Sequence, residues 1–332
     1  MRELFNPDLY HGAHKNKNYF EGWYYKLVDR YNNNKLAIIP GISYGNSDDE
    51  HHAFIQVLNG HDVIYDYIEF DSQDFKFNNN KFKISIKSNI FTLNNIDLNL
   101  EYNNKRINGH LIFKNTVKWP SNVFSPGSMG FYNYLKFMEC YSQVCIVNGS
   151  ILGCLNIDNK NIDFTGGKVY IEKNWGKSFP KSWLWIQSNN FKDRSVSVTC
   201  SLGEVPIPGK IFQGFLIGVT VNNKFISFTT INRSKLTLKS LGDDVTLTVQ
   251  NKNLRLTLKT FTNKNNFVLC KGPKNGTMSP AVKETLNGQV YMLLEDIKSN
   301  KKIYEDIGLS TGVEYGGTLM KDFSYSAKQK KL

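Results

Sequence analysis

The sequence predicts an all-β protein made of two barrel-like or sandwich-like domains, and three observations support this prediction. The chain has 332 residues, which is enough for two domains. It is 40% hydrophobic and 13% aromatic, and its 22 Phe and 17 Tyr favour strands. Short apolar runs recur between Asn- and Gly-rich turns, at the interval typical of a sandwich or barrel.

The first half of the chain is a series of expected strands joined by tight turns. The segments RYNNNK, LNGHD, FNNNK and EYNNKRING place Asn and Gly where hairpins need them. The strands are expected at 22–28, 36–43, 53–58, 63–70, 82–87, 96–102 and 107–113.

The second half repeats this style. Strands are expected at 195–201, 211–221, 225–231, 235–238, 245–250, 254–260 and 267–270. A hairpin of 290–296 and 302–307 over KSNK follows them. No long amphipathic helix is evident, and at most a short helix is expected at 280–286.

An internal similarity suggests where the domains divide. EGWYYKLVD and KSWLWIQSN each place an aromatic, strand-like run after a small residue, so two β units built alike are expected. FTGG interrupts the pattern near 163–167. We therefore predict domains at 1–165 and 166–324, followed by a flexible basic tail at 325–332. Large antiparallel sheets close or stack, which places a ligand site in a barrel mouth or between the domains.

Charge and cysteine usage exclude several classes of function. The net charge is +12, but the lysines lie in scattered Lys/Asn stretches and form no basic and aromatic platform, so nucleic acid is not an expected partner. The charge favours contact with an anionic surface or ligand. The five cysteines include no C-x-x-C pair, and the first residues include no apolar signal region. A cytoplasmic location is expected, with peripheral membrane contact left open.

The stretch 169–191, VYIEKNWGKSFPKSWLWIQSNNF, holds three of the five tryptophans. Gly176 and Pro180 break it into two strands. With a period of two, indoles and amides of the second strand share one face: Trp183, Trp185, Gln187 and Asn189. Its other face carries Leu184, Ile186 and Ser188, as in ordinary sheet packing. The first face suits the wall of a cavity for an apolar ligand with one polar end, and the alternative is a buried aromatic strand.

Four carboxylates lie next to aromatic or apolar residues, where an unpaired charge is costly: Glu21, Glu139, Glu172 and Glu314. Each is either paired, for example with Lys173 or Lys26, or protonated and able to act as an acid. For any one of them, a paired structural role is the simpler interpretation. Their recurrence in similar settings favours one functional carboxyl.

Motifs for other chemistries are absent. The chain has no Gly-rich phosphate loop, no G-x-S-x-G and no H-E-x-x-H. His11 and His14 form only an H-x-x-H pair, and the adjacent His51 and His52 would point to opposite faces of a strand. We predict no metal and no cofactor.

Three segments resemble the tocopherol cyclase family. They are YFEGWYYK at 19–26, EKNWGKSFPKSWLWIQSNNF at 172–191 and GVEYGG at 312–317. The family has an FEGWY element, a central EKNWG-x-x-FP-x-x-W-x-W-x-Q-x-N-x-F element and a C-terminal Glu before small residues, in this order. It is related in fold to lipocalin-like carotenoid hydratases. The resemblance thus implies two lipocalin-like β domains around a hydrophobic ligand cavity.

The resemblance also implies an activity. Family members close a chromanol ring by adding a phenolic hydroxyl across the nearest double bond of a prenyl tail. This requires a general acid, aromatic faces that stabilise a cation, and polar groups that hold the quinol. Glu172 or Glu139 is the expected acid, and Glu314 is a third choice. Glu172 and Glu314 lie in matched motifs, whereas Glu139 is a candidate on its local setting alone. The expected substrate-binding residues are Trp23, Tyr24, Asn174, Trp175, Trp183, Trp185, Gln187 and Asn189.

The predicted function is therefore a tocopherol cyclase-like enzyme acting on a prenylated quinol or related isoprenoid. Several segments that are longer in the plant enzymes are short or absent here, and the Asn- and Lys-rich style indicates a low-GC bacterium. The alternatives are a hydratase of an isoprenoid or polyene, a non-catalytic binding protein for a hydrophobic small molecule, and a purely structural β scaffold.

Overall fold

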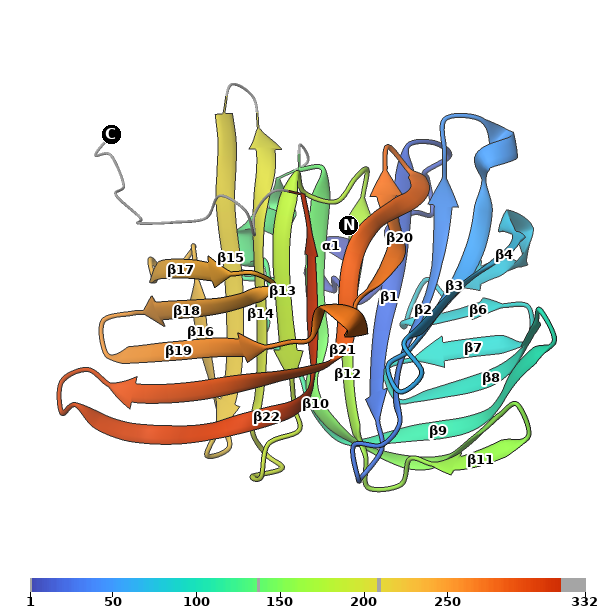
Figure 1. Cartoon of the computed structure of the whole chain (residues 1–332). Helices are drawn as coiled ribbons and strands as arrows, with labels where there is room; N and C mark the ends of the chain where they lie inside the picture. The colour runs from blue at the N-terminus through green and yellow to red at the C-terminus, as the bar shows by residue number, and fades with distance from the viewer. Residues whose placement is uncertain (1, 136–137, 208–209, 318–332) are drawn as a thin grey trace. The chain divides into compact units, whose positions relative to one another are not determined.

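The structure, a computed structural model, describes residues 2–135, 138–207 and 210–317, and strands dominate it (Figure 1). The predicted all-β class is confirmed. The short helices are α1 (Arg2–Phe5) and four 3-10 turns at Asp48–Glu50, Ser72–Asp74, Gly130–Tyr134 and Lys264–Asn266. Within the described residues, no helix is long and apolar enough to cross a membrane.

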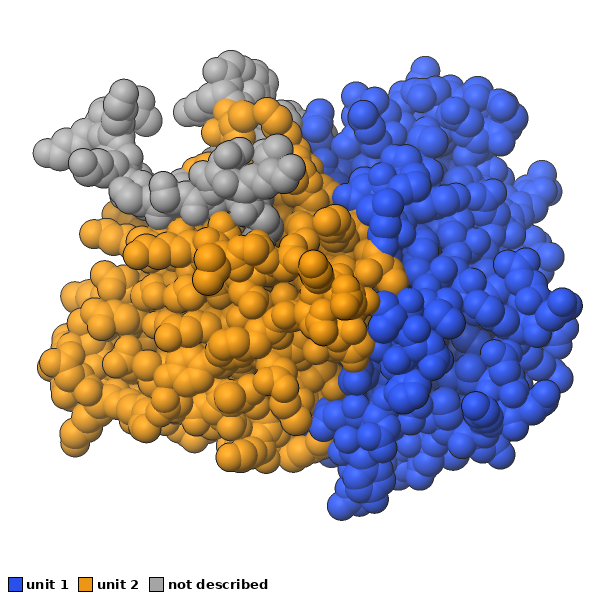
Figure 2. Space-filling model, viewed as in Figure 1, with its two compact units in different colours: residues 1–179, 269–281 blue, residues 180–268, 282–332 orange. Residues whose placement is uncertain are grey.

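The chain forms two compact units, shown in separate colours in Figure 2. The first contains residues 1–179 and 269–281, and the second contains 180–268 and 282–332. The boundary predicted at 165 lies inside the first unit, between two of its strands. The predicted tail at 325–332 lies outside the described residues.

The first unit is built on one antiparallel sheet. Its strands are β1 (Tyr19–Val28), β2 (Lys35–Tyr44), β3 (His52–Asn59), β4 (Ile64–Asp71), β5 (Phe75–Phe77), β6 (Lys83–Ile86), β7 (Asn89–Thr92), β8 (Asn95–Tyr102), β9 (Lys105–Val117), β10 (Cys140–Ile157), β11 (Lys160–Asp163) and β12 (Lys168–Gly176). The order is β4-β3-β2-β1-β12-β10-β9-β8-β7-β6-β5, with β11 on β10. The central strands β1 and β12 carry two of the motifs.

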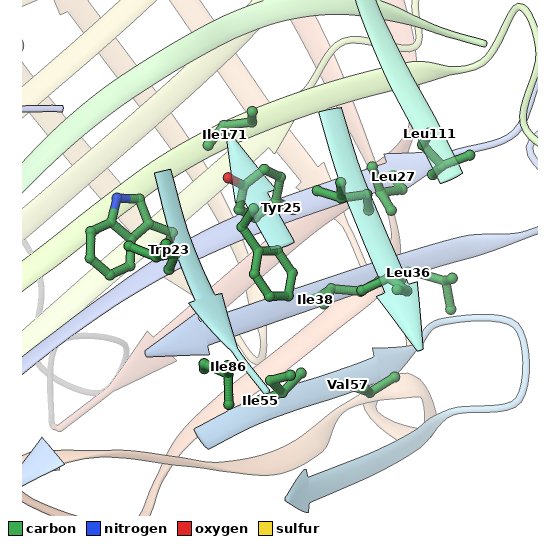
Figure 3. Packing of buried hydrophobic residues seen from close by; sticks show 14 of the residues in the cluster. Trp23, Tyr25, Leu27, Leu36, Ile38, Ile55, Val57, Ile86, Leu111 and Ile171 are labelled. Carbon is green, nitrogen blue, oxygen red and sulfur yellow. The ribbon is translucent and has the colours of Figure 1, made fainter. Parts of the chain in front are cut away.

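Alternate residues of these strands form the core of the first unit. Figure 3 shows Trp23, Tyr25 and Leu27 of β1 packed with Ile171 of β12 and with apolar side chains of β2, β3, β6 and β9. Because side chains alternate across a strand, the residues between them, such as Tyr24, face away from this core.

A hairpin from late in the sequence completes the first unit. It consists of residues 269–281, which include most of β20 (Val268–Lys274) and the start of β21 (Thr277–Asp296). The Phe179 N–H donates to the Pro273 carbonyl at 3.1 Å, and the Gly276 N–H donates to the Lys177 carbonyl at 2.8 Å. The strand β21 then continues into the second unit.

The second unit is also built on one antiparallel sheet. Its other strands are β13 (Ser182–Ser188), β14 (Ser197–Ile207), β15 (Lys210–Val221), β16 (Lys224–Thr229), β17 (Lys235–Leu241), β18 (Asp244–Gln250), β19 (Leu254–Phe261) and β22 (Lys301–Gly316). The order is β16-β15-β14-β13-β22-β21-β19-β18-β17, with β20 on β21. Its buried apolar cluster includes Leu184, Ile186 and Val313.

The predicted strands all overlap observed ones, but the short helix predicted at 280–286 is wrong. The strand β21 runs through this segment. Val282 and Glu284 are buried while Lys283 between them is exposed, which is the alternation of a strand with one covered face.

Candidate active site

The central motif folds into β12 and β13, with a turn between them. In β13, Leu184 and Ile186 belong to the apolar core of the second unit, as the period of two predicted. Trp183, Trp185 and Gln187 therefore occupy the opposite face of the sheet. The polar and aromatic face is thus not part of that core.

The two indoles lie directly over the neighbouring strand β22. A Cβ added to Gly316 would lie 2.0 Å from a ring carbon of Trp183, and one added to Gly312 would lie 2.5 Å from a ring carbon of Trp185. No side chain fits at either position. The small residues of the GVEYGG motif are therefore explained by the tryptophans that cover them.

Glu314 lies between these two glycines on the same face of β22. The Trp183 Nε1–H donates to Glu314 Oε1 at 2.6 Å. Trp185 is the cross-strand neighbour of Glu314 on β13. The side chain of Glu314 is half-buried. The Trp183 ring covers Gly316 on one side of it, and the Trp185 ring covers Gly312 on the other. Glu314 thus accepts a hydrogen bond from an indole, and its role as an acid stays a prediction.

A second carboxyl stands opposite Glu314 on the other side of β22. Glu284 of β21 is the register partner of Glu314, and only 2% of it is exposed. Cβ atoms of directly opposed residues lie about 5 Å apart in antiparallel sheets. The register therefore places two carboxyl side chains on one face of neighbouring strands. The sequence analysis did not identify Glu284.

The predicted amides continue along the same strand. Gln187 is the register partner of Gly312 and is fully buried. Asn189 follows just beyond the end of β13 and is 1% exposed. The structure thus brings Trp183, Trp185, Gln187 and Glu314 onto one sheet face.

Glu172 lies on the first unit, on the face of β12 that points away from the core. The Tyr170 hydroxyl donates to Glu172 Oε2 at 2.6 Å, and Asn174 Nδ2 donates to Oε1 at 3.2 Å. Tyr24 of β1 is the register partner of Glu172. Three predicted residues, Tyr24, Glu172 and Asn174, therefore form one polar cluster. The two hydrogen bonds fix the orientation of the Glu172 carboxyl.

Glu139 precedes β10 and has a half-buried side chain. Its backbone carbonyl accepts hydrogen bonds from the Lys177 N–H at 2.7 Å and the Ser178 N–H at 3.2 Å. These bonds hold the turn after β12. The observed contacts of Glu139 are thus backbone contacts, and its role as an acid stays a prediction.

The remaining predicted tryptophans lie on the inner face of the first unit, next to a buried ion pair. Lys173 Nζ lies 2.6 Å from Glu21 Oε1, and both side chains are fully buried. The same ammonium group lies 4.6 Å from the centre of the Trp175 ring and 5.2 Å from that of Trp23. The cation beside these two indoles is therefore a lysine of the protein itself.

The N-terminal segment covers this ion pair. Lys173 also donates to the carbonyls of Pro7, at 3.0 Å, and Leu9. The His11 N–H donates to Glu21 Oε2 at 2.9 Å, and the His11 ring stacks on Trp175 at 4.3 Å. These contacts hold the segment 7–11 against the end of the unit 1 core.

Burial shifts the titration of this cluster. Burial alone would raise the pKa of the Glu21 carboxyl, but Lys173 and His11 outweigh it and hold this pKa below its usual value. Burial and the nearby Lys173 charge lower the pKa of His11. His11 Nδ1 lies 2.8 Å from Lys173 Nζ, and Nε2 lies 3.2 Å from the Glu3 carbonyl. These contacts fit a neutral ring with its proton on Nε2.

Trp23 retains one feature of a ligand-binding residue. Its side chain is fully buried, and within the described residues its Nε1–H has no hydrogen-bond partner. A buried donor without an acceptor costs about 1–3 kcal/mol. Trp23 and Trp175 stay predictions as substrate-binding residues, and an acceptor atom of a ligand would satisfy the Trp23 donor.

Sequence reasoning thus anticipated the pairing of a carboxylate with Lys173 but not the part that His11 plays. In the sequence, His11 stands out only as part of an H-x-x-H pair, which indicates at most a metal ligand. Among the described residues, no three His, Cys, Asp or Glu side chains gather to hold a metal ion. His11 and Glu21 lie on different segments of the chain, so no short sequence motif predicts their contact.

Comparison with known proteins places this site in a family. A family model described as tocopherol cyclase-like matches residues 97–317, which include the central motif and GVEYGG. A chloroplastic probable tocopherol cyclase of Oryza sativa subsp. japonica is 26% identical over 196 residues, covering 57% of this chain and 42% of the rice protein. The chloroplastic tocopherol cyclase of Zea mays is 32% identical over 103 residues, covering 30% and 22%. The matches thus span less than half the length of these relatives.

Solved structures show the same fold at low identity. CghA with Sch210972 has a TM-score of 0.58 and 9% identity over 90% of this chain and 88% of that one. Kievitone hydratase from Nectria haematococca has a TM-score of 0.50 and 12% identity over 93% of each chain. The lipocalin-like β fold is therefore confirmed. Because the family model spans more than half of the chain, this protein belongs to the tocopherol cyclase-like family.

Proposed function

We propose that this protein is a cyclase-like enzyme that closes a ring on a prenylated quinol or a related isoprenoid. Membership of the family supports the reaction class. The observation that carries the proposal is Glu314, a carboxyl bonded to Trp183 and placed beside Trp185. An acid among indoles has the two properties that protonation of an alkene requires: a proton source and faces that stabilise a cation.

In the proposed reaction, the carboxyl of Glu314 gives its proton to one carbon of the alkene, and the other carbon becomes a tertiary cation. The phenolic oxygen of the substrate forms a C–O bond to that carbon. The phenolic proton then returns to the carboxylate, which restores the acid. Substrate and product are isomers, so no oxidant, reductant or cofactor enters the reaction. Glu284 is the register neighbour of this acid on β21.

Other predicted residues have supporting roles in this proposal. Gln187 and Asn189 follow Trp185 at alternate positions of the chain, and they are the proposed partners of the quinol hydroxyls. Holding the phenol near the alkene makes ring closure an oriented intramolecular step. Glu172 and Glu139 remain alternative acids.

The test is turnover of a panel of prenylated hydroquinones in detergent micelles, followed by chromatography and mass spectrometry for an isomeric product. Glu314→Gln should lower turnover by about 10²–10⁴-fold, the usual contribution of a general acid. Glu305→Gln is the matched control, because Glu305 is a surface carboxylate paired with Lys302 at 2.6 Å. Glu172→Gln and Glu139→Gln test the alternatives. Full activity in all three active-site variants would sink the carboxylic-acid mechanism.

A hydratase is the second candidate, and Glu172 favours it. Tyr170 and Asn174 donate hydrogen bonds to its carboxyl and would orient it as a base toward water. A hydratase would give a product heavier by one water and would depend on Glu172 more than on Glu314. A protein that binds the panel without converting any member would instead be a binding protein.

A further inference from the structure

The segment between β9 and β10 exposes large apolar side chains on a firmly held loop. We name residues 121–135 the aromatic loop. Its most exposed members are Val123, 65% exposed, and Phe124, 90% exposed. Single exposed apolar residues are common, but two adjacent ones at a loop tip are not expected, because turns favour Gly, Asn, Asp and Ser.

The turn that carries these two residues is well defined. The backbone N–H and C=O groups of Asn122 and Ser125 form two hydrogen bonds of 3.1 Å. The Asn122 side chain accepts from the N–H groups of Phe124 and Ser125, both at 2.9 Å. The backbone is thus satisfied within the turn, and Val123 and Phe124 project from its tip.

The rest of the aromatic loop adds to the same apolar surface. Phe131 is 45% exposed and Tyr134 is 37% exposed, both on the 3-10 turn Gly130–Tyr134. The Tyr134 hydroxyl donates to the Val123 carbonyl at 2.5 Å, which ties the 3-10 turn to the tip. The Tyr134 ring meets Phe5 edge-on at 6.3 Å between ring centres, and Phe5 is 53% exposed. The turn tip, the 3-10 turn and Phe5 are thus linked through Tyr134, and each exposes an apolar side chain.

Polar contacts on the inner side anchor this loop. The Ser128 N–H donates to Gln143 Oε1 at 2.9 Å, and Gln143 Nε2 donates to Asp8 Oδ1 at 3.0 Å. Asn133 Nδ2 donates to the Pro126 carbonyl at 2.6 Å. The buried side of the loop is polar and bonded, whereas the outer side is apolar. The exposure of the aromatic residues is thus built into the fold.

The charge pattern indicates which surface the patch fits. Residues 121–135 contain no charged side chain, so none must lose its hydration if the loop enters an apolar phase. Lys118, just before the loop, has a side chain 57% exposed and lies 3.5 Å from the Asp8 carboxylate. The whole chain carries +12, so exposed aromatic side chains on this cationic protein suit the interface of an anionic bilayer.

We propose that the aromatic loop docks this protein on anionic lipid bilayers by inserting Val123 and Phe124 into the interface. The proposal does not depend on the catalytic assignment. A second copy of the chain is a less suitable occupant, because a stable protein interface buries roughly 1,000 Å² or more with good complementarity. A turn tip that exposes nine-tenths of one phenylalanine offers a small, projecting contact instead.

The test is co-sedimentation of the full chain with vesicles of phosphatidylcholine containing phosphatidylserine. Wild type should bind, and Val123→Ser/Phe124→Ser should bind at least about tenfold more weakly, because the variant loses the two apolar side chains that would be buried in the bilayer interface. Leu241→Ser is the matched control, since Leu241 is 87% exposed at the end of β17 in the other unit. Its binding should equal that of wild type.

A second variant tests insertion directly. Phe124→Trp should show a blue shift of its fluorescence on vesicle addition, and quenching by bromine-labelled acyl chains. Thermal unfolding of each variant checks the fold. Wild type that stays in the supernatant, or equal losses in the loop and Leu241 variants, would overturn the proposal. So would a concentration-dependent dimer that the double substitution dissolves, because the patch would then serve self-association.

Discussion

Two carboxylates in this protein have tryptophan neighbours, and the structure gives them opposite settings. Glu21, in the first unit, is fully buried and paired with Lys173 at 2.6 Å. Glu314, in the second unit, is half-buried and accepts a hydrogen bond from the Trp183 indole at 2.6 Å. In one unit a lysine neutralises the carboxylate. In the other, the register neighbour on β21 is a second carboxyl, Glu284.

The difference lies in which strand face each residue occupies. Glu21 shares the inner face of β1 with Trp23, so its charge must be compensated inside the core. Glu314 lies on the face of β22 away from the core of its unit, between two glycines that leave space for indoles. The same combination of Glu and Trp therefore serves structure in one unit and is proposed to serve catalysis in the other.

The largest expected effect comes from breaking the ion pair. Lys173→Met should lower the free energy of unfolding by about 3–5 kcal/mol, because it leaves the Glu21 charge buried without its cation. Urea denaturation measures this loss. Lys302→Met is the control: its pair with Glu305 lies on the surface, where water screens the charges, so a much smaller loss is expected. Equal losses of unfolding free energy in the two variants would show that the buried pair contributes no more to stability than the surface pair. Adding Glu21→Gln to Lys173→Met should recover part of the loss.

A medium effect is expected at the glycines under the indoles. Gly312→Ala or Gly316→Ala should destabilise the second unit by about 1–3 kcal/mol, since each Cβ collides with a tryptophan ring. The near-ultraviolet circular dichroism of the tryptophans should change as well. Gly22→Ala is the control, because its nearest atom would lie 3.6 Å away. If all three variants behave alike, the indoles do not rest on β22 as described.

The smallest effect is a dependence of stability on pH that His11 causes. Because burial lowers the pKa of His11 in the folded state, the unfolded chain binds more protons as the pH falls. The contribution is fully present above about pH 6.5, the ordinary histidine pKa, and declines as the pH drops below it. His11→Gln should flatten the curve in this range, whereas His14→Gln, at an exposed position, should not. If wild type and His11→Gln show the same dependence of stability on pH, His11 is not its cause.

Local sequence patterns predicted much of the fold. Alternation placed Leu184 and Ile186 in the core, because side chains of a strand change face at every residue. The helix expected at 280–286 failed because the segment belongs to the 20-residue strand β21. Within 280–286, buried and exposed residues alternate only around Lys283.

The candidate site was less predictable, since it depends on strand register. The resemblance made Glu314 a candidate acid, but only the pairing of β22 with β13 and β21 brings Trp185 and Glu284 beside it. Likewise, Glu21 and Lys173 lie 152 positions apart in sequence (173 − 21), and the neighbouring positions of β1 and β12 bring them together. Pairings of this kind are set by the whole sheet, which no local window contains.

The late hairpin of the first unit has a consequence for synthesis. Residues 269–281 complete that unit, yet residues 180–268 must leave the ribosome before them. The hydrogen bonds of Phe179 and Lys177 to this hairpin cannot form until then. The nascent chain therefore lacks the hairpin that completes its first unit while most of the second unit is translated. A protein truncated after Phe179 would lack this hairpin permanently. Because each unit is made of two separate stretches of the chain, a single cut cannot separate one unit from the other.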